Sequence, residues 1–116
     1  MKQDNVIQDK SFKYAVRIVK LFMFLRNRGV EHTLSLQVLK SGTSIGANVE
    51  VAIGGSSKRD FVNKLKIAYK EARETSYWLR LLNKSGLLQG KLADSFLNDC
   101  DELLRILTSI LNTVKR

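Results

Sequence analysis

The chain lacks proline and carries only one cysteine and one histidine among its 116 residues. Without proline, glycine is the only residue left that readily interrupts a long helix. Cys100 has no partner for an internal disulfide, so we expect a buried, reduced thiol in a cytoplasmic protein. Cys100 and His32 together supply too few ligands for a structural zinc site. We therefore predict neither a metal nor any other cofactor.

Long hydrophobic runs are also missing. The longest apolar run is Leu21 to Leu25, and the wider stretch from Phe12 to Leu25 contains three cations. A helix that crosses a bilayer needs about 20 mostly apolar residues. Residues 1–9 are polar and do not have the apolar centre of a signal peptide. We expect a soluble, cytoplasmic protein that does not bind membranes.

Arrangements typical of enzymes are absent as well. With His32 as the single histidine, no triad of serine, histidine and acid can form. Glu71 and Glu74 have the spacing of paired acids on one helix, but no histidine follows them as in a di-iron bundle. We predict that the protein is not an enzyme.

Acids are scarce relative to bases. The chain has 20 Lys and Arg against 11 Asp and Glu, a formal net charge of +9. Residues 1–30 carry seven cations and two acids, a net +5, and residues 58–84 carry eight and three, again +5. Residues 31–57 have a net charge of −1, and residues 85–116 are neutral. Such a distribution favours anionic partners, nucleic acid or an acidic protein. A charged membrane surface ranks last, because no apolar face for insertion lies beside the cations.

Glycines divide the chain into four segments of similar length, each with apolar residues spaced three or four apart. That spacing is the period of an α-helix and not that of a strand. We predict helices over about 9–28, 33–53, 58–84 and 91–115, after a polar N-terminal tail of residues 1–8. Four such helices with short loops predict an all-α fold, an antiparallel up-and-down four-helix bundle, as one domain over 9–116.

The third predicted helix has two contrasting faces. One face is apolar and suited to a core: Phe61, Leu65, Ala68, Ala72, Thr75, Leu79 and Leu82. The opposite face carries six cations and a tyrosine without any acid, and we call it the basic stripe: Arg59, Lys66, Lys70, Arg73, Tyr77, Arg80 and Lys84. A helix needs the apolar face to fold, but folding does not require the other face to have one sign of charge.

The first predicted helix is more apolar than a bundle requires. One apolar stripe comprises Phe12, Val16, Val19 and Met23, and a second comprises Tyr14, Ile18, Leu21 and Leu25. Two apolar faces indicate two surfaces to bury, one in the bundle and one against another subunit. We assign the subunit interface to Tyr14, Ile18, Leu21 and Leu25; the alternative is a helix wrapped deeply within its own core.

The second predicted helix is rich in small residues between Ser41 and Asn48. Small side chains allow helix backbones to approach closely, and we predict close packing there. We expect its inward positions to include Asn48, which would then need a hydrogen-bonding partner.

Three stretches resemble a known family. The segments Ser41 to Glu50, Lys70 to Leu79 and Glu102 to Ile110 are similar to signatures of the second, third and fourth helices of bacterial four-helix-bundle proteins named after 23S ribosomal RNA intervening sequences. The resemblance covers about residues 9–116. One position departs: the family usually has glutamate three residues after Asn48, where this chain has Val51.

The resemblance implies a four-helix bundle that assembles as a homopentamer, with no catalytic residues to transfer. It also links the chain to the accessory proteins of diversity-generating retroelements, which are basic, pentameric and bind nucleic acid. These properties are expectations from the resemblance alone. The homopentamer agrees with the subunit interface inferred from the excess of apolar residues between Phe12 and Leu25.

Two functional hypotheses follow. In the first, the protein binds RNA or DNA through backbone phosphates, with the basic stripe as the contact and Lys13, Arg17 and Lys20 of the first helix adding to it. In the second, a homo-oligomeric scaffold docks an acidic protein on the same residues. A basic stripe that is merely solvated is the alternative to both. Helices one and three are diagonal in an up-and-down bundle, so their cations diverge within one subunit, and only assembly would bring copies together.

Overall fold

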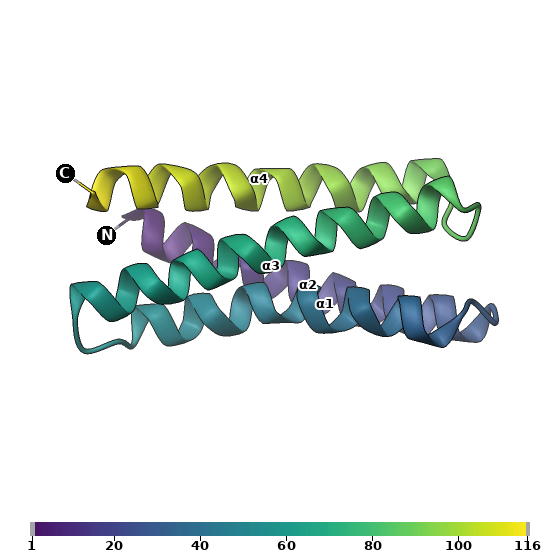
Figure 1. The fold of residues 1–116 in the computed structure, drawn as a ribbon, viewed down its shortest axis with the longest axis horizontal. Helices are drawn as coiled ribbons and strands as arrows, with labels where there is room; N and C mark the ends of the chain where they lie inside the picture. Colours follow the sequence, from purple (N-terminus) through teal and green to yellow (C-terminus); the bar gives the residue numbers. More distant parts are fainter. Residues whose placement is uncertain (1, 116) are drawn as a thin grey trace.

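The computed structural model describes residues 2–115 and confirms an all-α, antiparallel four-helix bundle (Figure 1). The helices are α1 (Lys2–Asn27), α2 (His32–Ile53), α3 (Lys58–Lys84) and α4 (Gly90–Val114). The bundle measures 45 × 20 × 18 Å. Each helix packs against two others, so that α1 lies diagonally across from α3 and α2 from α4. Surfaces on α1 and α3 therefore point away from each other.

Local signals in the sequence set most of the helix ends. The Ser57 hydroxyl accepts a hydrogen bond from the backbone N–H of Asp60 at 3.1 Å and caps α3. Gly29 follows α1 with a φ of 72°, a left-handed conformation that glycine adopts without strain. The carboxylate of Glu31 accepts from the backbone N–H groups of Thr33 and Leu34, and these bonds lower its pKa. The turns between the helices are consequently short and well defined.

The start of α1 differs from the prediction. Residues 1–8 were expected to form a tail and Asp9 to begin the helix, but α1 begins at Lys2; Met1 lies outside the described residues. Ile7 is buried, and the side-chain amide of Gln8 donates to both carboxylate oxygens of Glu50 on α2 at 3.1 Å. These contacts with residues distant in sequence extend the helix beyond the point that local polarity suggested.

The core follows the predicted helical spacing on α3 but not on α2. The predicted inner face of α3 is buried from Leu65 to Leu82. On α2, however, Val49 occupies the core, whereas Asn48 is half-buried and donates to the carbonyl of Ser44 within its own helix. A buried polar contact between α2 and α3 instead joins Thr75 and Ser41, whose hydroxyl oxygens are 2.9 Å apart.

Glycines bring α1 and α2 close together. A Cβ atom placed on Gly42 would lie 2.8 Å from Cγ1 of Ile18, and one on Gly46 would lie 3.1 Å from the carbonyl oxygen of Ser11. Ile18 is fully buried and β-branched, so its side chain has few other rotamers available. Close approach of the two backbones confirms the packing role predicted for the small residues of α2.

We therefore expect Gly42→Ala to destabilise the protein despite the better helix propensity of alanine. Overpacking against Ile18 should cost about 1–3 kcal/mol, against a gain of about 1 kcal/mol from propensity. Gly90, in the first turn of α4, has no atom near its Cβ direction and provides the matched control. Urea unfolding should show a lower midpoint for Gly42→Ala and an unchanged or higher one for Gly90→Ala; a stabilised Gly42→Ala would contradict this packing.

Two ionisable groups lie buried in the neutral form. The Cys100 thiol donates to the carbonyl of Ala72 at 3.2 Å, and burial raises its pKa to about 11. The Tyr14 hydroxyl donates to the carbonyl of Phe96 at 2.9 Å, and burial raises its pKa well above the usual value of 10.0. Both groups therefore stay protonated in the folded chain at pH values where they ionise in the unfolded chain.

The folding free energy should accordingly fall in alkali. Above pH 9 the unfolded chain loses the Cys100 proton first, so stability decreases by about 1.4 kcal/mol per pH unit until the folded thiol ionises near pH 11. Tyr14 adds a similar decrease above pH 10. Urea unfolding at pH 8 and pH 10.5 should show a smaller loss for Cys100→Ala than for the native sequence. Equal losses would show that the thiol does not titrate as described.

Candidate functional site

The basic stripe lies on the solvent side of α3. All seven of its side chains are exposed, while the reverse face of the helix is buried. No acid among the described residues forms an ion pair with any of its six cations. The structure thus presents Arg59 to Lys84 as an unneutralised row that follows about 37 Å of helix axis.

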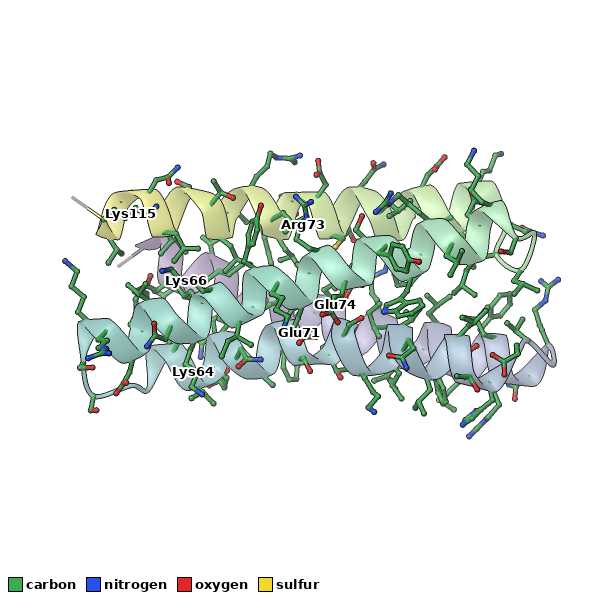
Figure 2. All side chains as sticks on the ribbon, viewed as in Figure 1. Lys64, Lys66, Glu71, Arg73, Glu74 and Lys115 are labelled. Atoms are coloured by element: carbon green, nitrogen blue, oxygen red, sulfur yellow. The ribbon has the colours of Figure 1, made fainter. Side chains whose placement is uncertain are left out.

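The two edges of α3 differ in charge. Lys66 and Arg73 extend from the edge nearer α4, whereas Glu71, Glu74 and Lys64 lie on the edge nearer α2 (Figure 2). Partial burial and the neighbouring carboxylate of Glu74 raise the pKa of Glu71, and the charge of Lys70 partly offsets this. Glu71 therefore lies in the fields of both an acidic neighbour and one cation of the basic stripe, and the edge nearer α4 carries the unopposed cations Lys66 and Arg73.

The cations predicted on α1 do not form a comparable surface. Lys13 pairs with Asp9 at 3.0 Å on the same helix. The guanidinium of Arg17 forms an ion pair with Asp99, with 2.6 Å between Nη1 and Oδ2. Its Nη2 donates to the Ser95 hydroxyl at 3.0 Å, and its Cζ lies 4.0 Å from the ring centre of Phe96. Of the three, Lys20 is exposed without an acid partner among the described residues.

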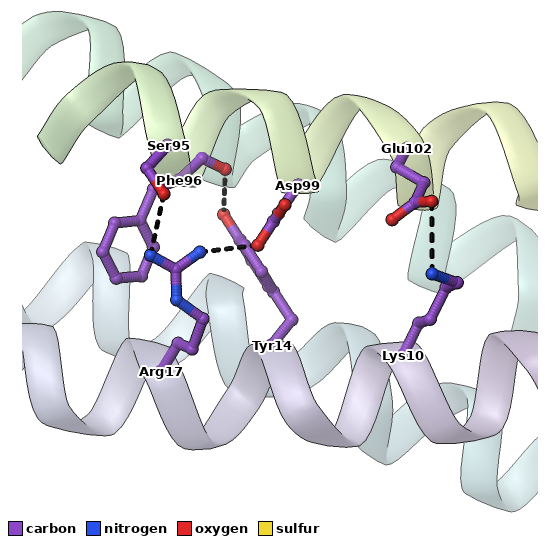
Figure 3. A network of polar contacts seen from close by, with 7 residues as sticks. All are labelled: Lys10, Tyr14, Arg17, Ser95, Phe96, Asp99 and Glu102. Carbon is purple, nitrogen blue, oxygen red and sulfur yellow. Dashed lines mark hydrogen bonds and ion pairs between the residues drawn. The ribbon is translucent and has the colours of Figure 1, made fainter. Parts of the chain in front are cut away.

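Arg17 is consequently a structural residue of the seam between α1 and α4. Figure 3 shows its guanidinium between Ser95 and Asp99, next to the Tyr14 hydroxyl on the Phe96 carbonyl and the ion pair of Lys10 with Glu102. The guanidinium of Arg17 is thus already engaged within the bundle, and its contact with a ligand stays a prediction. Its partners lie about 80 positions away on the last helix, where no local pattern in the sequence could show them.

The assignment of the two apolar stripes on α1 was reversed. The residues predicted at a subunit interface are at most 3% exposed and form part of the protein's own core: Tyr14, Ile18, Leu21 and Leu25. The exposed stripe, which we call the α1 apolar stripe, comprises Phe12 (66%), Val16 (40%), Val19 (43%) and Met23 (48%). The helix does carry a second apolar face, and that face points into solvent.

A shallow groove between α3 and α4 adjoins the basic stripe. It has a volume of about 180 Å³ and is lined by Lys66, Tyr69, Thr108, Leu111, Asn112 and Lys115. Lys115 had not been singled out from the sequence, because only the folded bundle brings the end of α4 beside the first half of α3 (Figure 2). The groove therefore has the ammonium groups of Lys66 and Lys115 at its edges and the apolar side chains of Tyr69 and Leu111 at its floor.

Other kinds of site find no support in residues 2–115. The described side chains contain no group of three or more His, Cys, Asp or Glu positioned to hold a metal ion. None of the four helices is both long and apolar enough to traverse a lipid bilayer.

Sequence comparison identifies the family. Residues 3–109 match the family described as 23S rRNA-intervening sequence protein. The chain belongs to that family. A similar solved structure is a protein with unknown function from the S23 ribosomal protein family of Bacteroides thetaiotaomicron, 48% identical, with a TM-score of 0.92. The likeness covers 95% of this chain and 98% of that one. No curated protein sequence matches the chain.

Membership of the 23S rRNA-intervening sequence protein family confirms the resemblance drawn from the three helical signatures. The link to retroelement accessory proteins stays a prediction, as does the homopentamer. At the position where the family usually has glutamate, Val51 is 54% exposed, and the preceding Glu50 holds Gln8 of α1. Glu50 thus has a structural contact of its own and does not replace the missing side chain.

Proposed function

We propose that the protein is a non-enzymatic, homo-oligomeric bundle that binds RNA or DNA through backbone phosphates. One observation carries the proposal: six exposed cations share one face of α3, and no described acid pairs with them. A row of this kind suits a polyanion whose charges repeat along its length. The apolar groups of the stripe are confined to the ring of Tyr77, so the surface offers little to an uncharged partner.

The character of the stripe favours contact with phosphates over reading of bases. Its cations emerge from one helix whose reverse side is buried in the core. Half of them are lysines, which act as flexible point charges without the geometry needed to distinguish bases. We therefore expect affinity to depend little on sequence and strongly on ionic strength.

Assembly follows from the α1 apolar stripe, for which we propose a second copy of the chain as the partner. Because α1 and α3 are diagonal in the bundle, packing α1 against another protomer leaves α3 free on the outside. An oligomer would then present several basic stripes to one nucleic acid, and linked sites raise the overall avidity. The homopentamer implied by the family resemblance would present five.

The proposal is tested by measuring affinity for a generic RNA and a duplex DNA at two salt concentrations, by fluorescence anisotropy. Six phosphate contacts predict a loss of about a thousandfold between 50 and 200 mM salt. Affinity that barely changes over this range would overturn phosphate-driven binding. A partner that stays bound in a pull-down after RNase and DNase treatment would instead favour the acidic-protein scaffold.

A further inference from the structure

Resting on the proposed function, we propose that the ligand is a single strand of RNA or DNA lying along the groove between α3 and α4. Lys66 and Lys115 would hold one phosphate at one end of this path, and the ring of Tyr77 would stack on one base farther along. The path thus combines two helices, whereas the basic stripe belongs to α3 alone.

The groove has the chemistry of a sugar-phosphate site. Lys66 comes from α3 and Lys115 from α4, and the side-chain amide of Asn112 adds a further donor. No acid lines the groove. Tyr69 and Leu111 give it an apolar floor, which suits the carbon face of a ribose or deoxyribose between two phosphates. Its volume of about 180 Å³ accommodates a group of that size but no complete nucleotide chain.

The charges on the edges of α3 direct the strand toward this groove. Lys66 and Arg73 extend toward α4, whereas Glu71, Glu74 and Lys64 occupy the edge toward α2, which has one net negative charge (Figure 2). On α4, Asp101 shares a face with Thr108 but pairs with Arg105. A polyanion on α3 would therefore be attracted more strongly to the edge toward α4. The Thr108 hydroxyl donates to the carbonyl of Leu104 at 2.8 Å, so its proton is already used, and the lysines must supply most of the attraction.

Tyr77 is the residue by which the surface would favour single-stranded over duplex nucleic acid. Its side chain is 51% exposed within the row of cations. The centres of the Tyr77 and Trp78 rings are 5.0 Å apart, with 77° between the ring planes. This edge-to-face contact limits the movement of the tyrosine ring. Tyr77 lies eleven positions after Lys66, a distance of about 16 Å along the helix axis. Lys70 and Arg73 lie between them.

An exposed aromatic ring in a row of cations is typical of surfaces that bind single strands, because every unpaired base offers a face for stacking. In a duplex the bases are already stacked and paired, and reaching Tyr77 would require a base to leave the helix. Single strands should therefore gain from Tyr77, and duplexes should not.

The test compares oligo(dT), oligo(rU) and an oligo(dT)·oligo(dA) duplex of equal length by fluorescence anisotropy. Tyr77→Ala should weaken binding of both single strands by about 5- to 150-fold and leave the duplex unchanged. Tyr77→Phe keeps the ring and should retain native affinity. Lys115→Ala should lower the slope of log affinity against log salt by about 0.7 for single strands. Lys91→Ala removes the same charge from α4 outside the groove and should not change that slope.

The outcomes separate this inference from the function on which it rests. A native protein that binds none of the three ligands with a steep salt dependence would overturn the proposed function itself. If affinity depends steeply on salt but Tyr77→Ala weakens binding of the duplex as much as that of the single strands, the single-strand inference alone is overturned. The same holds if Lys115→Ala and Lys91→Ala show the same slope of log affinity against log salt. A loss confined to oligo(dT) or to oligo(rU) would also overturn it, since neither contact involves the 2′-hydroxyl.

Discussion

Reversing three charges of the basic stripe, Lys66→Glu, Arg73→Glu and Arg80→Glu together, should reduce nucleic-acid affinity at 50 mM salt by more than about a thousandfold. Relative to 1 M salt, release of counterions at 50 mM contributes a factor of about 15 for each phosphate contact with a duplex and about 8 for each contact with a single strand, so three lost contacts multiply to roughly 3,000-fold or 500-fold. The three new carboxylates add repulsion. The helical content should be unchanged, because all three side chains are exposed and have no ion-pair partner among the described residues.

A matched variant separates the position of the charges from their number. Arg26→Glu, Lys40→Glu and Lys91→Glu change the net charge from +9 to the same value but lie on α1, α2 and α4, away from the stripe. Anisotropy titrations should show binding close to native for this control. If both variants lose affinity equally, overall charge is responsible and α3 is not the site. If the stripe variant still binds at the native level, the nucleic-acid proposal fails.

The path of α3 was predictable from sequence because every signal that sets it is local. Its core residues recur at helical spacing, Ser57 caps its start, and Gly86 follows its end with a φ of 77°. The cations on its outer face lie on one rigid element, so their common direction follows from the period of the helix. The basic stripe could therefore be located without coordinates.

Local signals in the sequence did not show which apolar face of α1 turns toward the core. Ile18 and Phe12 belong to stripes of similar hydrophobicity, and helical spacing does not rank them. The decision comes from α2, where Gly42 leaves space for Ile18 and Gly46 allows the backbone of Ser11 to come close. Contacts between helices settle the choice, and these contacts are absent from any single segment of the sequence.

The groove between α3 and α4 could not be predicted from the sequence for a related reason. Lys66 and Lys115 belong to different helices, and whether they face one groove depends on the rotation of α4 about its own axis. The same holds for Arg17, which pairs with Asp99 across the seam between α1 and α4 and so leaves the set of free cations. Sites made by one helix are visible in sequence, whereas sites shared by two helices need the packed bundle.

A second large effect is expected on assembly. Phe12→Glu with Met23→Glu should convert the proposed oligomer into a monomer of about 13 kDa, the mass of one chain. Packing a carboxylate into an apolar interface costs several kcal/mol unless a partner compensates it, and the variant also loses two of the four apolar side chains of the α1 apolar stripe. Because Phe12 and Met23 are 66% and 48% exposed in the single chain, the bundle itself should fold normally.

Light scattering on the native protein and on this variant, with circular dichroism as a check on folding, measures the effect. Val51→Glu with Ile67→Glu is the matched control, since these side chains are 54% and 39% exposed on α2 and α3 and lie outside the α1 apolar stripe. The control should keep the native mass. A native protein that scatters as one chain would contradict the assembly, and a Phe12 and Met23 variant of native mass would place the interface elsewhere. If assembly does align several basic stripes on one ligand, the monomeric variant should bind nucleic acid more weakly even though every cation of α3 is intact.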